Sequence, residues 1–230
     1  MYESNFKRVE QKYLLTKEQY VKLFDMIKEN IKKNKYFETT ICNVYFDTDN
    51  NDLIINSIEK PIYKHKVRVR SYGVPKLEDD VFLEVKIKYK KVVEKRRIKL
   101  TLKEFNDYLN YGKTNLDDQI MKELDYLFKF YNLKPAYFVA YDRKSYKGCD
   151  DKNLRITIDT NLRSRKTDLS LELGDSGKLY FDKEVYIMEI KTLNAMPLWL
   201  VRSLSSLAIY PVSFSKYGSI YIKDREEVIC

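Results

Sequence analysis

Several short segments of the chain alternate charged and apolar residues one by one. In the stretch 66–70, Lys66, Arg68 and Arg70 are separated by two valines, and the stretches 81–88, 154–159 and 186–191 repeat the pattern. A period of two is typical of a β-strand whose two faces meet different surroundings. Together these segments predict a sheet with one apolar face and one mainly basic face, into which a few carboxylates are set.

The composition is that of a globular chain. Of its 230 residues, 44% are hydrophobic and 33% are charged, and no composition shift or linker divides them, so we expect one domain over residues 1–230. No apolar run approaches the roughly 20 residues that a membrane helix needs. The first residues lack the apolar stretch of a secretory signal. These features lead us to expect a cytoplasmic protein.

The net charge and the rare residue types limit which ligands the chain can bind and which kinds of site it can form. A net charge of +9 attracts nucleic acid, anionic lipid or phosphorylated small molecules without choosing among them. The three cysteines have no paired spacing, and His65 is the only histidine, which excludes a histidine metal cluster. The sequence has six glycines and neither G-x-x-x-x-G-K-[ST] nor G-x-G-x-x-G. Any binding of phosphate must therefore rely on side chains.

Strands and helices are expected in separate groups along the chain. Helices are predicted after the capping boxes that begin at Thr16 and Thr101, over 116–131, and from Pro197 to about 207. Strands are predicted through residue 15, over 41–48, 53–56, 64–72, 81–89, 92–100, 136–146, 153–161 and 185–192, and near 179, with the segment 213–218 closing the domain. Because helices and strands do not alternate one for one, the pattern favours an α+β fold with a mainly antiparallel sheet.

The basic residues of the strands matter as a set. For one such strand alone, the ordinary explanation of its charged side is that this side faces water. A whole sheet face in water, however, should carry both signs of charge together with neutral polar residues. Here the carboxylates that interrupt the cations are chiefly Glu10, Glu84 and Glu189. If the sheet closes into an antiparallel β-barrel with helices packed outside, the cations face a lumen and need an anion there. The sequence therefore predicts a basic tunnel for a chain of phosphates.

The three carboxylates suggest a divalent metal. Mg²⁺ or Mn²⁺ often bridges one or two carboxylates and the phosphates of a substrate. Glu10, Glu84 and Glu189 share the parity of their basic neighbours, so each should point with them. The alternative for each is a salt bridge within the basic face, and this alternative is strongest for Glu84.

A series of short motifs resembles one family. In order, the chain contains R-V-E-Q-K-Y from residue 8, V-R-V-R-S-Y-G from 67, F-L-E-V-K from 82, K-R-R from 95, Y-D-R from 141, L-R-I-T-I-D from 154, M-E-I-K from 188 and S-F-S-K-Y-G from 213. This series is similar to the catalytic domain of the vacuolar transporter chaperone (VTC) polyphosphate polymerases. These belong to the triphosphate tunnel metalloenzymes, whose antiparallel β-barrel forms a tunnel. Each motif alone is weak, but together they cover nearly the whole chain.

The resemblance implies roles for individual residues. The catalytic residues that it implies are the phosphate-contacting Lys12, Arg68, Arg70, Lys86, Lys95, Arg143, Arg155, Lys191 and Lys216. Tyr141, Ser215, Arg97 and Arg8 are expected to assist in substrate binding, and Glu189, aided by Glu10, is expected to hold the metal. Adenylate cyclase and thiamine triphosphatase relatives carry Glu-x-Glu-x-Lys on the first strand, where this chain has Arg8 in place of the first Glu. The exchange favours the polymerase branch and long polyanions.

The leading hypothesis is a metal-dependent phosphoryl transferase that makes inorganic polyphosphate from the γ-phosphate of ATP, with Mn²⁺ or Mg²⁺. A tripolyphosphate or nucleoside-triphosphate hydrolase in the same tunnel is the alternative, since only the acceptor differs. A non-catalytic polyanion-binding module stays open as well. RNA binding would use exposed aromatic residues, but the 20 tyrosines are scattered through apolar positions, which argues against nucleic acid. The expected partners are ATP and polyphosphate, and membrane-associated partner proteins stay open.

Overall fold

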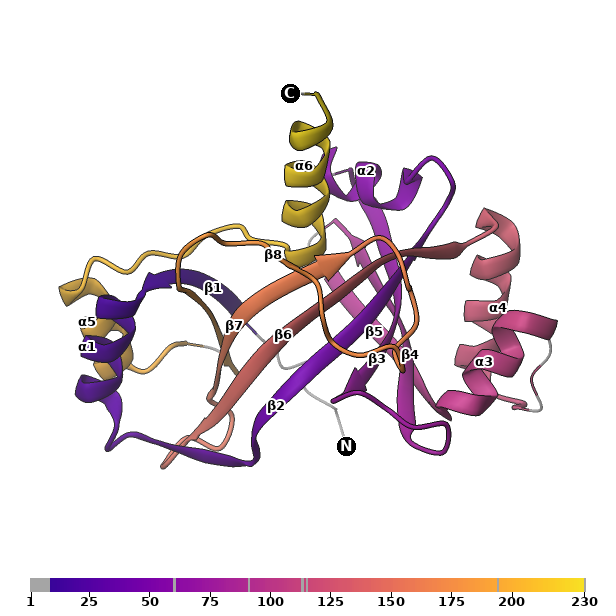
Figure 1. Ribbon diagram of the computed structural model, residues 1–230. Helices are drawn as coiled ribbons and strands as arrows, with labels where there is room; N and C mark the ends of the chain where they lie inside the picture. The colour runs from indigo at the N-terminus through magenta and orange to yellow at the C-terminus, as the bar shows by residue number, and fades with distance from the viewer. Residues whose placement is uncertain are drawn as a thin grey trace. The chain divides into compact units, whose positions relative to one another are not determined.

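The structure is a computed structural model that describes residues 9–229 except 60, 91, 113, 115 and 194, and it does not describe the side chains of 228 and 229. The strands are β1 (Val9–Thr16), β2 (Ile31–Asp47), β3 (Tyr63–Tyr72), β4 (Asp80–Tyr89), β5 (Val92–Thr101), β6 (Lys134–Gly148), β7 (Arg155–Arg165), β8 (Lys178–Leu179) and β9 (Val185–Thr192). The helices are α1 (Lys17–Ile27), α2 (Asp52–Glu59), α3 (Leu102–Tyr111), α4 (Gln119–Tyr131), α5 (Leu198–Ser206) and α6 (Lys216–Ile229) (Figure 1).

The strands form one mainly antiparallel sheet. They pair in the order β1-β9-β7-β6-β2-β3-β4-β5, and β8 pairs with β7. The pairs β1–β9, β7–β9, β2–β3, β3–β4 and β4–β5 are all antiparallel. The predicted α+β class is therefore confirmed. In the described part of the chain the pairing order has two ends, β1 and β5, so these pairings do not close the sheet into a ring.

The chain divides into two compact units. The first unit comprises Met1–Thr39, Tyr141–Leu162 and Phe181–Phe214, and the second comprises Thr40–Ala140, Arg163–Tyr180 and Ser215–Cys230. The long strands β2, β6 and β7 contribute residues to both units. Each unit has a hydrophobic core of its own. The single domain that we expect from the sequence stays a prediction.

The core of the first unit lies between its strands and the helices α1 and α5. Leu15, Ile156 and Met188 point from the strands into a cluster that also takes Leu23 from α1 and Leu200 from α5. Helix α1 begins where the sequence predicts, because the Thr16 hydroxyl accepts a hydrogen bond from the Gln19 amide and the Gln19 side chain accepts one from the Thr16 amide. In Figure 1, α1 and α5 lie side by side.

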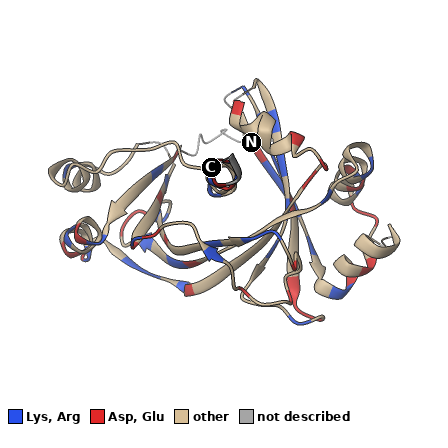
Figure 2. Cartoon of the chain, turned by 45° about the horizontal axis from the view of Figure 1, so that its top comes forward, with Lys and Arg blue, Asp and Glu red and all other residues tan. Residues whose placement is uncertain are grey.

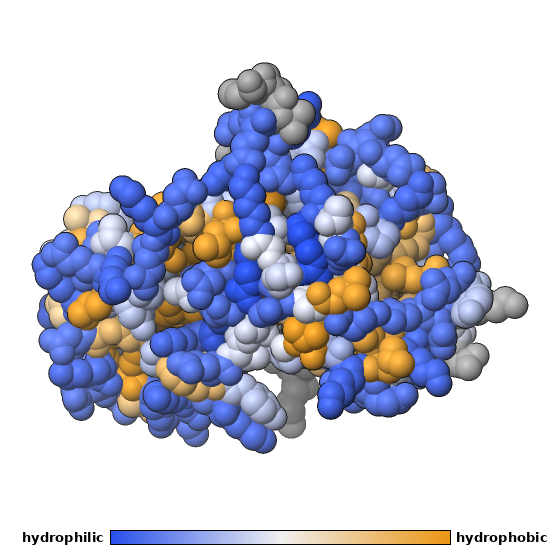
Figure 3. All heavy atoms as spheres, viewed as in Figure 1, coloured by the Kyte–Doolittle hydropathy of each residue, from blue (hydrophilic) through white to orange (hydrophobic). Residues whose placement is uncertain are grey.

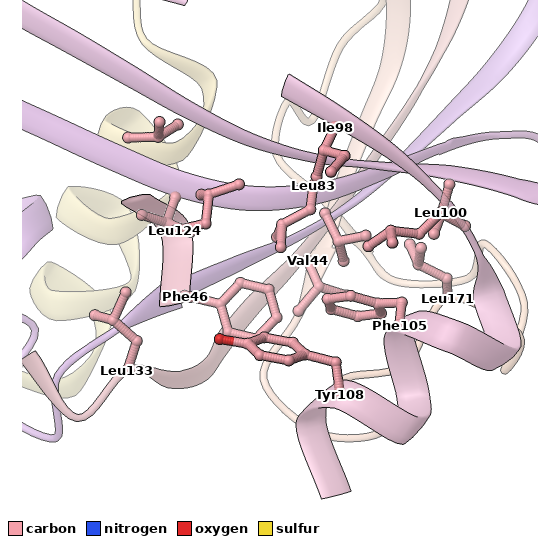
Figure 4. Packing of buried hydrophobic residues seen from close by; sticks show 14 of the residues in the cluster. Val44, Phe46, Leu83, Ile98, Leu100, Phe105, Tyr108, Leu124, Leu133 and Leu171 are labelled. Carbon is pink, nitrogen blue, oxygen red and sulfur yellow. The ribbon is translucent and has the colours of Figure 1, made fainter. Parts of the chain in front are cut away.

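The core of the second unit is rich in aromatic rings. The Phe46 ring lies 5.0 Å from the Phe128 ring and 6.1 Å from the Phe105 ring, measured between centroids. Figure 4 shows Phe46, Phe105 and Tyr108 turned toward one another beneath the strands. The Phe46 ring comes from β2, whereas α3 supplies Phe105 and Tyr108 and α4 supplies Phe128. Both helices contact β5, and α3 begins at the predicted capping box of Thr101 and Glu104. This packing turns the apolar residues of β2, β4 and β5 toward the helices, and their polar residues alternate to the other face.

The strand predicted over residues 53–56 is wrong, because this stretch lies in helix α2. The Asp47 carboxylate accepts hydrogen bonds from the amides of Leu53 and Ile54, and the Thr48 hydroxyl accepts one from the Asp52 amide. These bonds satisfy amides that are left open at a helix start. The residues that α2 buries are Leu53, Ile54 and Ser57, which follow helical spacing.

The segment 213–218 does not close the domain, because it leads into the helix α6. Tyr217, Ile220 and Tyr221 are buried at helical spacing along α6. The Ser215 hydroxyl accepts a hydrogen bond from the Gly218 amide at 3.2 Å, as at the start of a helix. A Cβ on Gly218 would lie 3.2 Å from that hydroxyl oxygen, so the glycine lets the first turn of α6 close tightly over Ser215.

Figure 3 shows the hydropathy of one face of the molecule, on which hydrophobic residues form separate patches among hydrophilic ones. Exposed hydrophobic residues are ordinary on the surface of a globular protein. None of the described helices combines the length and the hydropathy that are needed to cross a bilayer.

The buried His65 predicts a dependence of stability on pH. Its ring is 7% exposed and packs against the ring of Tyr131 at 5.0 Å, and burial lowers its pKa. The unfolded chain takes up a proton near pH 6.5, above the pKa of the folded state. We therefore expect the free energy of unfolding to fall as the pH is lowered through and below that value. Urea unfolding between pH 5 and 8 measures the slope, which His65→Phe should reduce. An equal slope in that variant would assign it to other groups.

Candidate functional site

The basic residues of β3, β4 and β5 form one group in the second unit. We call it the Glu84 cluster, and it consists of Lys66, Arg68, Arg70, Glu84, Lys86, Lys95 and Arg97. The strand register places Arg68 opposite Glu84, which in turn lies opposite Arg97. The next row consists of Lys66, Lys86 and Lys95. The predicted alternation thus brings residues from three strands to one face of the sheet.

Glu84 is the buried centre of this cluster. The carboxylate is 1% exposed, and it accepts a hydrogen bond from Arg68 Nε at 2.8 Å while Lys95 Nζ lies 2.7 Å from its other oxygen. Arg68 also donates to the hydroxyl of Tyr45 at 3.0 Å. Arg70 is 8% exposed and donates to Asn43 at 2.9 Å. The salt-bridge alternative for Glu84 is therefore the one found, and Glu84 holds Arg68 in place.

Cations outnumber carboxylates in the Glu84 cluster by six to one. Lys86 lies between Lys66 and Lys95 in the register, and like charges that are directly opposite one another destabilise a sheet. Figure 2 shows Lys and Arg in blue along the strands. Such a row is stabilised when an anion lies against it, and phosphates are suitable anions. The remaining cation of the set, Arg97, is exposed and its guanidinium lies 4.9 Å from the centre of the Phe82 ring.

The charges of the cluster shift the pKa values of its members. Burial opposes the ionisation of Glu84, but Arg68, Arg70 and Lys95 together lower its pKa to about 2. Burial and the charges of Arg68 and Arg70 lower the pKa of Lys95 to about 8, although Glu84 acts in the opposite direction. Lys95 can thus lose its proton at mildly alkaline pH.

We expect the affinity of the protein for tripolyphosphate to fall as the pH rises above about 8, the pKa of Lys95. A bound anion favours the charged lysine, so binding takes up a proton in this range, and the affinity can fall by up to about tenfold for each pH unit. Calorimetric titrations between pH 7 and 9.5 measure the change. Lys95→Arg, which stays charged, should bind with a flatter pH profile, and the same profile in both proteins would contradict the assignment.

The start of α6 lies beside the Glu84 cluster within the second unit. Lys66 donates to the hydroxyl of Ser215 at 2.9 Å, and Lys216 is the first residue of the helix. The Tyr217 ring stacks on the Tyr45 ring at 4.4 Å, and its hydroxyl donates to Asp47 at 3.1 Å. Ser215 and Lys216 are therefore held at a helix N-terminus next to a lysine, where amides and positive charge favour an anion.

A second group of charged residues lies on β1, β6, β7 and β9 in the first unit. We call it the Glu189 cluster, and it consists of Glu10, Lys12, Arg143, Arg155, Asp159, Glu189 and Lys191. In the register of β1 and β9, Lys12 lies opposite Glu189 and Glu10 opposite Lys191. On the other side of β9, Arg155 lies opposite Lys191. Opposite charges thus alternate along β1 and β9 and between these two strands, whereas Arg155 and Lys191 bring two cations together.

Glu189 is enclosed by cations. Its side chain is 12% exposed, and its Oε1 lies 2.6 Å from Lys191 Nζ. Burial opposes its ionisation, but Lys191, Lys12 and Arg143 together lower its pKa. Lys12 itself donates to the backbone carbonyl of Phe214 at 3.1 Å. Glu189 is therefore a carboxylate that stays ionised, as a metal ligand must.

Arg143 is fixed by a partner that the sequence did not single out. Asp159 is fully buried, and its two oxygens accept hydrogen bonds from Arg143 at 2.6 and 2.8 Å. The Arg143 guanidinium also lies 5.2 Å from the centre of the Tyr141 ring, and Tyr141 is 3% exposed. Asp159 shares the parity of Arg155 on β7, and this spacing was the signal that could have identified it.

The carboxylates can be tested as ligands of a divalent metal. Glu10 and Glu189 both reach the same ammonium group, that of Lys191, at 3.4 and 2.6 Å. Among the described residues no group of three or more His, Cys, Asp or Glu could hold a metal. Mg²⁺ and Mn²⁺ sites often use one or two carboxylates and take their other ligands from phosphates and water. The pair therefore fits a metal that binds together with a phosphorylated substrate.

The structure thus distributes the predicted residues between two clusters, and each cluster is complete within its own unit. Lys12, Tyr141, Arg143, Arg155, Glu189, Lys191 and Glu10 belong to the first unit, and Arg68, Arg70, Lys86, Lys95, Arg97, Ser215 and Lys216 belong to the second. Arg155, Lys86 and Arg97 are exposed, while Arg70 and Tyr141 are buried. Arg8 lies outside the described residues.

The family model described as the VTC domain matches residues 7–222. The chain belongs to the VTC domain family. A comparison with curated proteins finds no match.

Solved structures share the fold of this VTC domain. A proposed adenylate cyclase from Bacillus halodurans is 15% identical, with a TM-score of 0.56 over 90% of this chain and 93% of that one. A proposed adenylyl cyclase from Hippeastrum, which has a dominant triphosphatase activity, is 13% identical, with a TM-score of 0.54 over 92% of this chain and 94% of that one. At such identities the likeness concerns the fold, and the VTC domain has the triphosphate tunnel fold.

Proposed function

We propose that this VTC domain transfers the γ-phosphate of ATP to a growing chain of inorganic polyphosphate. The observation that carries the proposal is the excess of cations on one face of β3, β4 and β5, above all the row of Lys66, Lys86 and Lys95. A row of like charges of this kind is best stabilised by a linear anion whose charges repeat along its length. A chain of phosphates meets that requirement, and the triphosphate of ATP is a short form of the same chain.

Phosphoryl transfer requires little covalent chemistry from the protein. The transferred group must be aligned between donor and acceptor, and the charge on its oxygens must be neutralised. Arg68 is held by Glu84 and Tyr45, and Arg143 is held by Asp159, so both can present their guanidinium groups without reorganisation. The acceptor is the terminal phosphate of the polymer. It is already anionic and needs no strong general base.

The metal that the family implies would be held by Glu189 with help from Glu10. A bound Mg²⁺ or Mn²⁺ supplies Lewis-acid polarisation of the phosphoryl oxygens. The protein's own part is to keep Glu189 ionised, since Lys191, Lys12 and Arg143 lower its pKa. The same cations bind phosphate oxygens directly.

The second candidate function is hydrolysis of tripolyphosphate or of nucleoside triphosphates. It is favoured by the similarity in fold to the Hippeastrum protein with a dominant triphosphatase activity. In this alternative the same residues bind the substrate, and water takes the place of the polymer as acceptor. A non-catalytic polyanion-binding module would bind a polyanion with the same cations but would not turn over a substrate.

One experiment separates these functions. Purified protein is incubated with ATP and Mn²⁺, the products are resolved on a gel for polyphosphate, and free phosphate is measured in parallel. We expect a polyphosphate ladder together with ADP. Free phosphate without polymer would establish the hydrolase instead. Neither product, in a protein whose melting temperature tripolyphosphate still raises, would identify a binding module.

A further inference from the structure

A buried hydroxyl group that the interactions described above do not use lies beside Glu189 in the strand register. Thr157 lies on β7 and is 7% exposed. Its Oγ1 has no hydrogen-bond partner within the part of the chain that the structure describes. A buried polar group without a partner costs free energy, so hydroxyls in such places are normally paired. Valine has the same shape and would fill the position without this cost.

The strand register places this hydroxyl among the charged groups of the cluster. Thr157 is the direct partner of Glu189 on β9, and the next residue across the sheet is Lys12 on β1. Along β7 the neighbours on the same face are Arg155 and Asp159, since every second residue shares a face. Asp159 in turn holds Arg143. The Thr157 side chain is therefore surrounded by the groups to which phosphate and metal binding are assigned.

We propose that the Thr157 hydroxyl donates a hydrogen bond to a phosphate oxygen of the bound substrate, which makes Thr157 a substrate-contacting residue. The inference rests on the proposed function, because it takes a phosphate chain to lie against the Glu189 cluster. A hydroxyl carries one donor and two acceptor sites, and its donor is matched by the non-bridging oxygens of a phosphate. The ligand supplies the partner that the Thr157 hydroxyl does not find among the described residues.

Calorimetric titration with inorganic tripolyphosphate tests this proposal, first without metal and then with Mn²⁺. Thr157→Val removes the hydroxyl and keeps the shape, and Thr157→Ser keeps the hydroxyl. Thr160→Val is the matched control, because Thr160 lies on the same strand with the opposite parity. We expect Thr157→Val to bind about tenfold more weakly, as for the loss of one hydrogen bond to a charged group. Thr157→Ser and Thr160→Val should bind within about threefold of the wild type.

The melting temperature of the free protein distinguishes contact with the substrate from a structural role. We expect Thr157→Val to melt no lower than the wild type, because it removes an unpaired buried group. Unchanged binding in Thr157→Val overturns the proposal. Weaker binding that is accompanied by a clearly lower melting temperature also overturns it, since the hydroxyl would then support the fold.

The same protein preparations are assayed for polyphosphate and free phosphate, so that the two proposals can fail separately. Polymer formation by the wild type together with normal binding by Thr157→Val would overturn the role of Thr157 alone. Tripolyphosphate binding that depends on Thr157, without polymer formation, would overturn the polymerase alone. A wild-type protein that does not bind tripolyphosphate would overturn both.

Discussion

Glu189→Gln is expected to slow the consumption of ATP by about 10²–10³-fold, the size of effect seen when one preorganised electrostatic group is removed. Glutamine keeps the shape of the side chain but loses the charge that a divalent metal requires. Polyphosphate binding should survive, because the cations around Glu189 remain. In the absence of metal, binding should become tighter, since a negative charge has been removed from an anion site. Turnover assays and metal-free calorimetry measure the two effects.

The matched control is Glu29→Gln, which changes the same charge at an exposed position of the first unit. We expect its turnover and its affinity to equal those of the wild type. Wild-type turnover in Glu189→Gln would remove Glu189 from the site. Loss of both turnover and polyphosphate binding would instead mean that Glu189 supports the basic residues around it rather than a metal.

The strands that carry the site could be predicted from the sequence because their alternation is strict. β9 begins and ends at the predicted residues, Val185 and Thr192, and β3 and β4 each begin one residue before their predicted starts. A strand with a charged residue at every second position fits the sheet in only one orientation of its faces, since a slip of one residue in the pairing register would bring those charges into the apolar core. The same pattern therefore determined both the strands and the face that the cations share.

The helices that flank the Glu84 cluster were harder to predict. α2 has only 8 residues, and its start depends on the carboxylate of Asp47, which precedes the helix by five residues. α6 contains a glycine and many charged residues, and the tyrosines that it buries are covered by residues far away in the chain, such as Tyr45 and Tyr137. Tertiary contacts of this kind override local propensity.

The partners of the cations could not be derived from spacing alone. Parity places Asp159 and Thr157 on the face of Arg155, but it cannot reveal that Asp159 pairs with Arg143 on another strand while Thr157 has no described partner. That distinction depends on the packing of side chains across neighbouring strands. The same packing decides whether a residue on this face positions a cation or can contact the substrate.

Asp159→Asn is expected to lower the free energy of unfolding by about 3–5 kcal/mol, the usual cost of removing one partner from a buried ion pair. Asp159 is fully buried, and both of its oxygens are used by Arg143. Asparagine can accept one of these bonds but removes the charge of the carboxylate to which the guanidinium is hydrogen-bonded. Urea unfolding measures the loss. Asp142→Asn is the control, because Asp142 is less buried and its oxygen accepts a neutral hydrogen bond from Asn161.

The ligand should reverse part of this loss. A bound phosphate offers Arg143 a new negative partner, so tripolyphosphate should raise the melting temperature of Asp159→Asn more than that of the wild type. This comparison links the stability of the fold to the occupancy of the site, because the same guanidinium is stabilised by Asp159 in the free protein and by the anion on binding. An equal rise in both proteins would mean that Arg143 serves the fold alone, and the phosphate would then be bound by Lys12, Lys191 and Arg155.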